Sequence, residues 1–547
     1  MTGGELLVRS LEAAGVEVVF GLPGVHNLAI WRALAESDIR LVGVRHEQAA
    51  AYAADGYARS SGRPGVALVT TGPGAANAVA ATGEAWASGS PIVVIATDIP
   101  ASLRRPGVYR GVLHETTDQA AMFEPVTKAQ LRVSDASLIG PMVRSALQIA
   151  ELPPSRPVYV EIPTDLLTAD PGEREAETSD WEWKTELPAS DCAPALELLA
   201  EAERPLIWAG GGAMRAGAGE AVGELARKLA APVITTYQAS GLLGRGHPCD
   251  VGLPPFVPEA GGLWDDADLV IAIGSDLDGT STQNWAQPQP RRMLAINIDS
   301  EDASKNYRPD VVMVGDARVV CEALCAQAPD RGGVPALAGH LERLRDETWL
   351  RLDDEEPGAA QFLRSVARAL PDEAVVVADM CIPGYWLGGF YRPPAPRRLL
   401  YPLGWGTLGC GFPQGLGAAL SGAGPAVSFS GDGGFLYAAG ELATMAQEQI
   451  PLTAVIVDDG GYGMLRYDQK VKGDPIYGVD LKTPDFEALA VTFGIEAETV
   501  EGLGDAFGSA LAEQVRRPEP TVLVAKAALD PPPNTSPRWY RRVAAPR

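Results

Sequence analysis

The sequence predicts an α/β protein built from three open parallel sheets with helices on both faces, and three observations support this. The chain has 547 residues, enough for three or four domains of about 150 residues. Short β-branched runs, each followed by a glycine-rich turn and an Ala- and Leu-rich helical pattern, recur along it, an order typical of parallel sheets. The 60 glycines and 45 prolines follow no fixed period, which indicates many tight connections. Ligands of such sheets bind at the carboxyl ends of the strands.

The first unit is predicted over residues 1–170. An Ala-rich helix is expected over 48–62, after the second strand, because the stretch QAAAYAADGYARSSG is rich in helix-forming alanine. The acidic, polar stretch 171–190 is predicted to be a linker. The expected strands of the first unit lie within 16–24, 41–48, 65–74 and 91–98.

The second unit is predicted over 190–330 and the third over 355–530, with an irregular stretch at 328–339 between them. The Pro-rich, basic tail 531–547 is expected to pack over a surface, where Arg538, Trp539, Tyr540 and Arg541 cap the site or act as a brace. The expected strands lie within 205–212, 231–238, 268–275 and 292–300 in the second unit, and within 374–380, 426–434, 452–461 and 521–529 in the third.

Charge and composition narrow the classes of function. The net charge of −25 argues against nucleic acid or an anionic membrane as the main partner. No run of 18 apolar residues occurs, so no membrane span is expected, and the N-terminus lacks the pattern of a secretory signal. The six cysteines are scattered without a CxxC pair. Cys321 and Cys325 can share a helix face, but buried free thiols are the favoured interpretation, and a cytoplasmic location is expected.

The segment 426–461 carries the most informative motif. A predicted strand ends in Gly431-Asp432-Gly433-Gly434, where glycines let backbone N–H groups approach a phosphate at a helix start. Twenty-four residues separate Gly433 from the pair Asp458-Asp459, enough for one helix and the next strand, so the two acidic clusters are expected at neighbouring strand ends. Carboxylates with a diphosphate form an oxygen shell suited to Mg²⁺. The alternative is two unrelated solvated turns, with Asp432 as an ordinary helix cap.

With this motif the sequence resembles the thiamine-diphosphate (ThDP) enzymes of the decarboxylase and acetolactate-synthase type. Their shared motif is GDG, a spacer of similar length and usually two asparagines, and the resemblance extends over nearly the whole chain. It implies that Asp432, the side chain of Asp459 and the main-chain carbonyl of Gly461 are the Mg²⁺ ligands. The chain departs from the pattern by having Asp458-Asp459 in place of the asparagines. A second anionic group should tighten metal binding but repel the diphosphate.

Two further segments match the family's cofactor loops. In 404–420, Leu408 falls where a bulky residue wedges between the two rings of the cofactor, and the carbonyl of Gly406 where the 4′-amino group is held. In 378–386, Met380 and Cys381 fall at the tip of a second diphosphate loop. A core leucine and a plain strand-end turn are the alternatives. The other cofactor-binding residues that the resemblance implies are Gly24, Thr71, Asn77, Gly431, Gly433, Gly434, Tyr462, Gly463 and Met464.

Glu47 is the candidate catalytic acid. It lies at a strand end before the Ala-rich helix, where a carboxylate also favours the helix N-terminus. Residues 45–48 read RHEQ, a family motif whose glutamate hydrogen-bonds N1′ of the cofactor's pyrimidine, so that the 4′ nitrogen can deprotonate C2. The resemblance places Glu47 and the metal motif of one site on different chains. It therefore implies a homodimer as the smallest competent unit, and commonly a homotetramer.

The substrate pocket is expected to draw on the same first unit. His26 and His114, with Gln119, are candidate catalytic residues that bind the substrate carboxylate or move protons to the developing alkoxide; structural histidines are the alternative. The remaining pocket candidates are Val25 and Asn27 in the first unit, and Leu465 after the metal motif.

The resemblance implies cleavage or formation of a C–C bond next to a carbonyl, through an enamine, with a 2-oxo acid or 2-hydroxyacyl substrate. Residues 113–115 read LHE and 463–469 read GMLRYDQ, departures from the FQE and GMVRQWQ of acetolactate synthases. The segments GVHNL (24–28), LHETTDQ (113–119) and MCIPGYW (380–386) resemble in part those of the 5-guanidino-2-oxopentanoate decarboxylases. The alternatives are a 2-hydroxyacyl-CoA lyase, a flavin-containing synthase or pyruvate-oxidase-like enzyme, and a non-catalytic homologue. FAD in the second unit is a further hypothesis, because Gly210–Gly212 open a strand–helix turn but lack the GxGxxG spacing.

Overall fold

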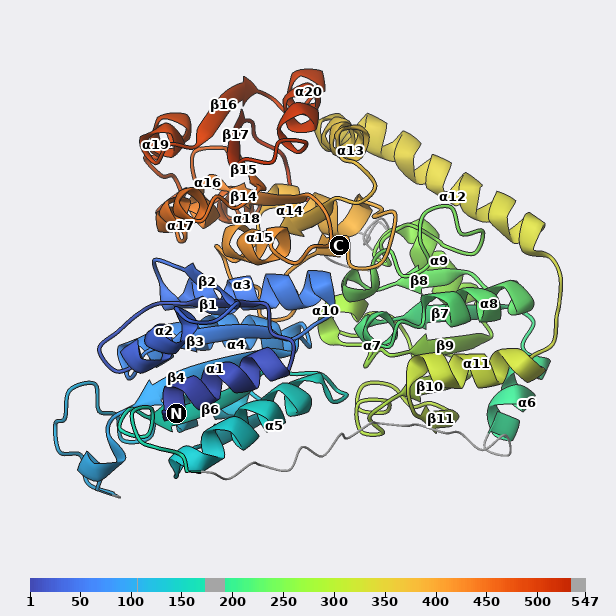
Figure 1. The fold of residues 1–547 in the computed structure, drawn as a ribbon. Coiled ribbons are helices and arrows are strands. Elements are labelled where there is room, and N and C mark those ends of the chain that lie inside the picture. Colours follow the sequence, from blue (N-terminus) through green and yellow to red (C-terminus); the bar gives the residue numbers. More distant parts are fainter. Residues whose placement is uncertain (106, 173–191, 533–547) are drawn as a thin grey trace.

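A computed structural model describes residues 1–105, 107–172 and 192–532, and it contains three parallel sheets flanked by helices (Figure 1). The predicted three-sheet α/β architecture is confirmed. The predicted linker 171–190 and the tail 531–547 lie almost wholly outside the described residues, as do Arg538, Trp539, Tyr540 and Arg541.

The first sheet has the strand order β2-β1-β3-β4-β6-β5, and every adjacent pair is parallel. Its strands are β1 (Val18–Gly21), β2 (Arg40–Gly43), β3 (Gly65–Val69), β4 (Ile92–Asp98), β5 (Ala129–Arg132) and β6 (Val158–Pro163). Its helices are α1 (Gly3–Ala13), α2 (Leu28–Leu34), α3 (Glu47–Ser61), α4 (Pro73–Ala87) and α5 (Ile139–Glu151). The predicted Ala-rich helix is α3, which ends at Gly62 in the left-handed conformation that glycine favours.

The second sheet has the parallel order β11-β10-β9-β7-β8. Its strands are β7 (Pro205–Ala209), β8 (Val233–Thr235), β9 (Leu269–Ile273), β10 (Met293–Asn297) and β11 (Val311–Val314). Its helices are α6 (Ala193–Glu201), α7 (Gly211–Arg215), α8 (Gly219–Leu229), α9 (Pro258–Asp266), α10 (Gly279–Thr282) and α11 (Ala317–Gln327).

The third sheet has the parallel order β13-β12-β14-β15-β17-β16. Its strands are β12 (Val375–Ala378), β13 (Leu399–Leu400), β14 (Ala426–Gly431), β15 (Leu452–Asp458), β16 (Glu496–Glu501) and β17 (Thr521–Lys526). Its helices are α13 (Pro357–Ala369), α14 (Ile382–Phe390), α15 (Gly411–Ala419), α16 (Asp432–Phe435), α17 (Leu442–Gln447), α18 (Gly463–Lys472), α19 (Phe486–Thr492) and α20 (Asp505–Gln514).

The connection between the second and third sheets corrects one prediction. The stretch 328–339 was expected to be irregular, but its second half begins the 22-residue helix α12 (Val334–Glu355). Pro335 lies in the first turn of α12, where its missing N–H leaves no helical hydrogen bond unmade and its fixed φ suits the helix. The proline therefore starts a helix here. Figure 1 shows α12 running along the outside of the molecule from the second sheet to α13.

The first and third units pack against each other through α3 and α15, which lie one above the other in Figure 1. A Cβ on Gly417 would overlap the carbonyl of Ala53, and one on Gly56 would overlap the carbonyl of Gln414. The buried alanines of α3 belong to the same apolar core as Phe412 and Leu416 of α15. Absent side chains thus let the two helices approach closely, and one core joins the unit that carries Glu47 to the unit that carries Asp432.

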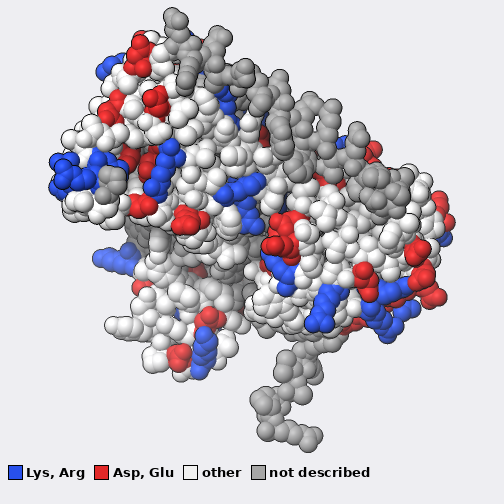
Figure 2. Space-filling view, turned by 90° about the horizontal axis from the view of Figure 1, so that it is seen from below, with Lys and Arg blue, Asp and Glu red and all other residues white. Residues whose placement is uncertain are grey.

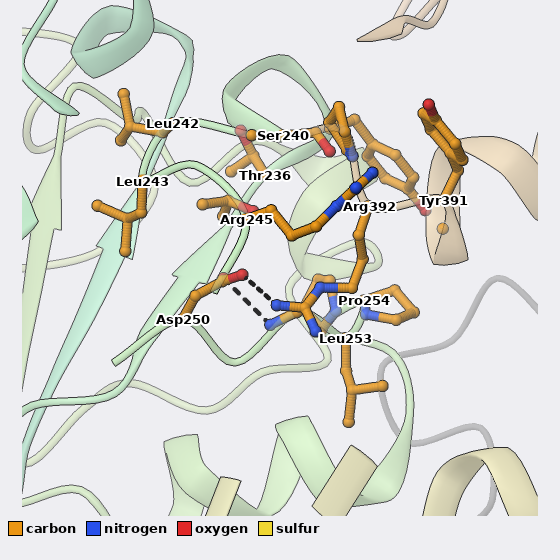
Figure 3. A pocket seen from close by; sticks show the side chains of 18 of the residues that line it. Thr236, Ser240, Leu242, Leu243, Arg245, Asp250, Leu253, Pro254, Tyr391 and Arg392 are labelled. Carbon is orange, nitrogen blue, oxygen red and sulfur yellow. Dashed lines mark hydrogen bonds and ion pairs between the residues drawn. The ribbon is translucent and has the colours of Figure 1, made fainter. Parts of the chain in front are cut away.

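The second and third units meet at a small cavity of about 50 Å³ (Figure 3). Arg392 Nη2 donates to Asp250 Oδ2 at 2.6 Å, and Arg345 Nη1 donates to the Asp250 carbonyl at 3.0 Å. Its charged side chains pair across the boundary and its volume holds little more than water, so this cavity is a seam between domains.

The surface carries charges of both signs. Figure 2 shows acidic and basic side chains interspersed over the face seen from below. The six cysteines form no disulfide with one another, and all except the half-buried Cys381 are buried, as predicted. In the described parts of the chain, every helix is too short or too polar to cross a lipid bilayer.

Candidate functional site

A cavity of about 140 Å³ opens where β12, β14 and β15 end. Thirteen of the predicted site residues line it, all of them from the third unit. They are Met380, Cys381, Leu408, Gly431, Asp432, Gly433, Gly434, Asp459, Gly461, Tyr462, Gly463, Met464 and Leu465. The predicted neighbourhood of the two acidic clusters follows from the sheet, because β14 and β15 are adjacent and Gly431 is in register with Val457.

Asp432 and Asp459 present buried oxygens to this region. Asp432 Oδ2 and Asp459 Oδ1 are buried without a hydrogen-bond partner among the described residues, and Arg466 Nη1 lies 3.9 Å from Asp459 Oδ1. Burial raises the pKa of both carboxyls, that of Asp432 to about 7. Buried polar atoms without partners are costly, and a hard divalent cation is the group that two carboxylates suit best.

The donor set fits Mg²⁺ with a diphosphate. No group of three or more His, Cys, Asp or Glu side chains with the geometry of a metal site occurs within the described ranges. Two carboxylates and the Gly461 carbonyl would therefore need oxygens from a diphosphate or water to complete the shell of six that Mg²⁺ requires. Gly461 has φ +156°, and a Cβ there would overlap the Val479 carbonyl. Only glycine can therefore occupy position 461 and place its main-chain carbonyl beside the cavity.

The turn from β14 into α16 is built for close approach to its backbone. A Cβ on Gly433 would lie 2.7 Å from the Tyr462 ring, and one on Gly431 would lie 3.2 Å from Cys381 Cβ. The Gly433 N–H donates to Asp432 Oδ1 at 2.8 Å, which holds the unpartnered Oδ2 in a fixed direction. Successive N–H groups in such a turn favour an anion.

Asp379, which the sequence analysis did not single out, organises the neighbouring loop. Its Oδ1 accepts hydrogen bonds from the N–H groups of Met380 at 2.7 Å and Gly409 at 3.0 Å. Burial raises the pKa of Asp379 to about 6. Asp379 thereby ties the loop that carries Met380 to the residue after Leu408. The signal was an acidic residue at the end of a predicted strand.

Glu84 of α4 holds the loop that presents Gly406 and Leu408. It is fully buried. Its Oε2 accepts from the N–H groups of Gly406 at 3.0 Å and Thr407 at 3.2 Å and from Thr407 Oγ1 at 2.9 Å, while Oε1 accepts from the Leu403 N–H at 3.2 Å. Trp405 packs against Gly83, where a Cβ would lie 2.7 Å from the indole. The first unit therefore positions a loop of the third unit in the same chain.

Glu84→Ala is expected to raise the amide-exchange rates of Leu403, Gly406 and Thr407 by about tenfold or more. Without the Glu84 carboxylate, the loop can open without losing the hydrogen bonds that these N–H groups donate to it. Hydrogen–deuterium exchange with mass spectrometry of the 403–408 peptide measures this. The peptide that contains Gly409 is the internal control, since Asp379 holds that amide. Unchanged exchange at 403–407 would show that Glu84 does not restrain the loop.

Glu47 is the first residue of α3 and is 8% exposed. Asn77 Nδ2 of α4 donates to Glu47 Oε2 at 3.0 Å, and a Cβ on Gly74 would lie 3.2 Å from Glu47 Oε1. The start of α3 is fixed from the third unit, because Glu441 Oε1 accepts from the N–H groups of Arg45 and His46, both at 3.0 Å. Two of the predicted residues, Glu47 and Asn77, thus lie in contact.

His26 and His114 also lie together. Their ring centroids are 5.3 Å apart at an interplanar angle of 69°, and the Nδ1 atom of each is buried without a hydrogen-bond partner in the described structure. Burial and the nearby His114 lower the pKa of His26. His114 has φ +66°, a conformation that a side chain of its size rarely adopts and that often marks functional sites.

The turn beside His26 is held by Asn27. Asn27 Oδ1 accepts from the Gly24 N–H at 2.7 Å, and Nδ2 donates to the Leu22 carbonyl at 3.0 Å. Asn27 is fully buried, whereas Val25 is 65% exposed. Asn27 therefore shapes the turn that presents Val25 and His26.

Gln119 lies in a buried polar network. Its Nε2 donates to the Thr97 carbonyl at 2.9 Å and to Tyr159 Oη at 2.8 Å, and its Oε1 accepts from the Gly72 N–H at 2.5 Å. Thr71 Oγ1 hydrogen-bonds Thr97 Oγ1 at 2.8 Å. The amide of Gln119 is thus committed to the Gly72 turn, whose φ is +65°.

Glu161, on β6, is a further member of this network that the sequence analysis missed. Tyr159 Oη donates to Glu161 Oε2 at 3.2 Å. Burial and the charge of Asp98 raise the pKa of Glu161 to about 7. The strand reads as an ordinary buried run, and only the neighbouring strand β4 brings Asp98 to it.

We expect wild-type stability to fall relative to Glu161→Gln as pH rises from 5 to 8. The folded-state pKa lies above the ordinary value of 4.5, so the contribution of protonated Glu161 is complete below pH 4.5 and is lost as pH rises through 7. The difference reaches about 3 kcal/mol at most, at 1.36 kcal/mol per pKa unit. Urea unfolding of both proteins at pH 5 and pH 8 measures it, and parallel pH dependences would contradict the assignment.

A larger cavity of about 430 Å³ lies at the carboxyl ends of strands in the second sheet. Gly211 and Gly212, from the turn considered for a flavin, line it together with Arg215, Asp276 and Asp278. Burial and neighbouring cations lower the pKa of Arg215 to about 10. Residues 86–89 and 153–156 of the first unit and Leu403 and Gly404 of the third also line the cavity, so it lies where the second unit meets the other two, at the position where parallel sheets bind ligands.

Comparison with known proteins identifies the family. Three models of the thiamine pyrophosphate (thiamine diphosphate) enzymes match the chain: the N-terminal binding domain over residues 1–122, the central domain over 192–324 and the C-terminal binding domain over 381–525.

Relatives match over nearly their full lengths. A probable 2-ketoarginine decarboxylase, AruI, of Pseudomonas aeruginosa is 36% identical over 517 residues, covering 92% of this chain and 90% of its own. A probable acetolactate synthase large subunit of Methanocaldococcus jannaschii is 31% identical over 560 residues, covering 96% and 91%. An acetolactate synthase large subunit of Mycobacterium tuberculosis is 31% identical over 547 residues, covering 94% and 86%. This chain therefore belongs to the thiamine pyrophosphate enzymes.

Proposed function

We propose that this protein is a ThDP- and Mg²⁺-dependent lyase that decarboxylates a 2-oxo acid. The observation that carries the proposal is the 140 Å³ cavity, which gathers the Asp432, Asp459 and Gly461 oxygens with the Met380 and Leu408 loops in a member of this family. When bound, ThDP would supply an acidic carbon that can act as a nucleophile toward the substrate carbonyl, and an electron sink for the pair released with CO₂.

The residues of the chain divide the remaining tasks. Asp432, Asp459 and the Gly461 carbonyl would hold Mg²⁺, and the backbone N–H groups of the β14–α16 turn would hold phosphate oxygens. Glu47, fixed by Asn77, would share a proton with the pyrimidine nitrogen. Leu408 and the Gly406 carbonyl would orient the pyrimidine, on a loop held by Glu84. His26 and His114 would bind the substrate carboxylate or exchange a proton at the carbonyl oxygen.

A homodimer is the smallest assembly that this proposal supports. Among the described residues, the cavity is lined only by the third unit, whereas Glu47 belongs to the first. A second copy would bring its Glu47 to the cavity and complete two equivalent sites, in agreement with the symmetry of most homo-oligomers. A homotetramer would be two such dimers. Light scattering of the purified protein tests the assembly.

We propose a substrate with a guanidinium-bearing side chain, supported by the acids near Tyr385 and Tyr467 and by the name of one relative. Tyr385 lines the cavity. Burial is the main cause that raises the pKa of Tyr385, and nearby negative charges, among them Asp468, raise it further. Asp468 and Tyr467 both lie on helix α18. The charges of Asp530 and Glu356 act on Tyr467. Burial and the charge of Asp530 raise the pKa of Glu356 to about 7. A cation would relieve this crowding of acids, and a 36% identical relative carries the name 2-ketoarginine decarboxylase.

A panel of 2-oxo acids tests the proposal. The protein is incubated with 5-guanidino-2-oxopentanoate, pyruvate, 2-oxobutyrate or phenylpyruvate, with and without ThDP and Mg²⁺, and CO₂ and organic products are measured. ThDP-dependent CO₂ release that is fastest with the guanidino acid is expected. Acetolactate from pyruvate would favour a carboligase, a CoA requirement a lyase, and co-purified flavin absorbance a flavin-containing synthase. No ThDP-dependent turnover would favour a non-catalytic homologue.

A further inference from the structure

The ends of β14 and β15 concentrate negative charge. Three carboxyls, those of Asp432, Asp458 and Asp459, follow two adjacent strands, and a bound diphosphate would add its own charge. Burial raises the pKa of Asp432, and the nearby charges of Asp459 and Asp458 raise it further. Asp432 and Asp459 have the orphaned oxygens suited to a cation. Asp458 has a different partner.

Asp458 is paired with Lys526. The side chain of Asp458 is 3% exposed and that of Lys526 is 41% exposed, and Lys526 Nζ donates to Asp458 Oδ2. The pairing follows from the third sheet: Asp458 is the last residue of β15, Lys526 is the last residue of β17, and the two are in register. Side chains in register on parallel neighbours project to the same face of a sheet, which brings the ammonium to the buried carboxylate.

The pair lies against the wall of the cofactor cavity. Asp459, the next residue, lines the cavity, and so do Ala527 and Leu529, which follow Lys526. The Ala527 N–H donates to the Asp458 carbonyl at 3.2 Å, and the Gly460 N–H donates to Asp458 Oδ1 at the same distance. Asp458 is therefore fixed on both oxygens and on its main chain, and it turns its charge toward Lys526.

We propose that Lys526 is a positioning residue that neutralises Asp458 and so keeps this third carboxylate from opposing the diphosphate at the Asp432–Asp459 site. The inference rests on the proposed cofactor site. An unpaired buried carboxylate beside a diphosphate site repels the diphosphate more strongly than it would in water, because the effective dielectric of such a cavity is low. With Lys526 present, Asp432 and Asp459 remain to face a divalent cation, and Asp459 also has Arg466 Nη1 at 3.9 Å from its Oδ1.

Binding measurements with a double-mutant cycle test this without turnover. The dissociation constant of ThDP is measured by calorimetry at saturating Mg²⁺ for the wild type, Lys526→Met, Asp458→Asn and the double variant. We expect Lys526→Met to weaken ThDP binding by about tenfold, an effect of about 1.4 kcal/mol, because Asp458 is then uncompensated. Asp458→Asn should bind at least as well as the wild type, and the double variant should return to within about threefold of it.

Three controls separate charge from packing. Lys526→Arg keeps the charge and should retain wild-type affinity. Lys305→Met removes a lysine of similar exposure, 42%, whose Nζ donates to Asp302 at 2.8 Å in the second unit, and should not change ThDP binding. Melting temperatures without cofactor report any loss of folding in each variant.

Two results would overturn the inference. Unchanged affinity in Lys526→Met would make the pair a plain structural contact, and an equal loss in Lys526→Met and the double variant would show that Lys526 acts independently of Asp458. If the wild type itself binds no ThDP, the proposed function fails instead, so the two failures are distinguishable.

Discussion

Glu47→Gln is expected to slow exchange of the ThDP C2 proton by at least about 100-fold while leaving ThDP bound, since general acid–base contributions are typically of 10²–10⁴. Glutamine keeps the size of the side chain and an acceptor for Asn77 Nδ2, which donates to Glu47 Oε2 at 3.0 Å. It has no acidic proton to share with the pyrimidine nitrogen. Hydrogen–deuterium exchange at C2, followed by proton NMR after acid quench, measures the rate.

The matched control for this experiment is Glu124→Gln, an exposed glutamate of the same unit, which should exchange at the wild-type rate. ThDP affinity is determined in parallel, because loss of binding would also slow exchange. Wild-type exchange in a fully loaded Glu47→Gln protein would remove Glu47 from the catalytic role and leave it as a charge at the N-terminus of α3.

Asp432→Ala is expected to weaken Mg²⁺-dependent ThDP binding by at least about 100-fold, because among the described residues it removes one of the two carboxylates that line the cavity and present oxygens without hydrogen-bond partners. Without cofactor its melting temperature should stay at or above the wild-type value, since a crowded buried carboxyl has been removed. The rise in melting temperature that ThDP and Mg²⁺ give the wild type should disappear in Asp432→Ala, because that rise comes from ligand binding to the folded state.

Calorimetry and thermal melting with and without ThDP and Mg²⁺ measure both effects. Asp458→Asn is the matched control, since it removes a carboxylate at the end of the neighbouring strand and should keep the cofactor-dependent rise. An Asp432→Ala protein that still gains that stability from ThDP and Mg²⁺ would place the metal elsewhere.

Local sequence determined the three-sheet architecture. The predicted strands are rich in β-branched residues, and several end in a glycine turn, so their conformation depends on neighbours within a few residues. The 24-residue spacing from Gly433 to Asp458 likewise predicted that Asp432 and Asp459 share one cavity, because one helix and one strand fit that length and adjacent parallel strands end at the same edge. Helix α12 was missed because Pro335 reads as a breaker, although in the first turn it favours a helix.

The tertiary structure decided the partners of the buried charges. Glu84 holds Gly406, 322 residues away, and Lys526 meets Asp458 across 68 residues. Neither pairing leaves a trace in a local pattern, because it arises from the packing of the first unit on the third and from the order of strands β15 and β17. Periodicity and spacing report which residues reach a strand end. Which charge faces which is set by long-range packing, because desolvation penalises a buried carboxylate that lacks a partner.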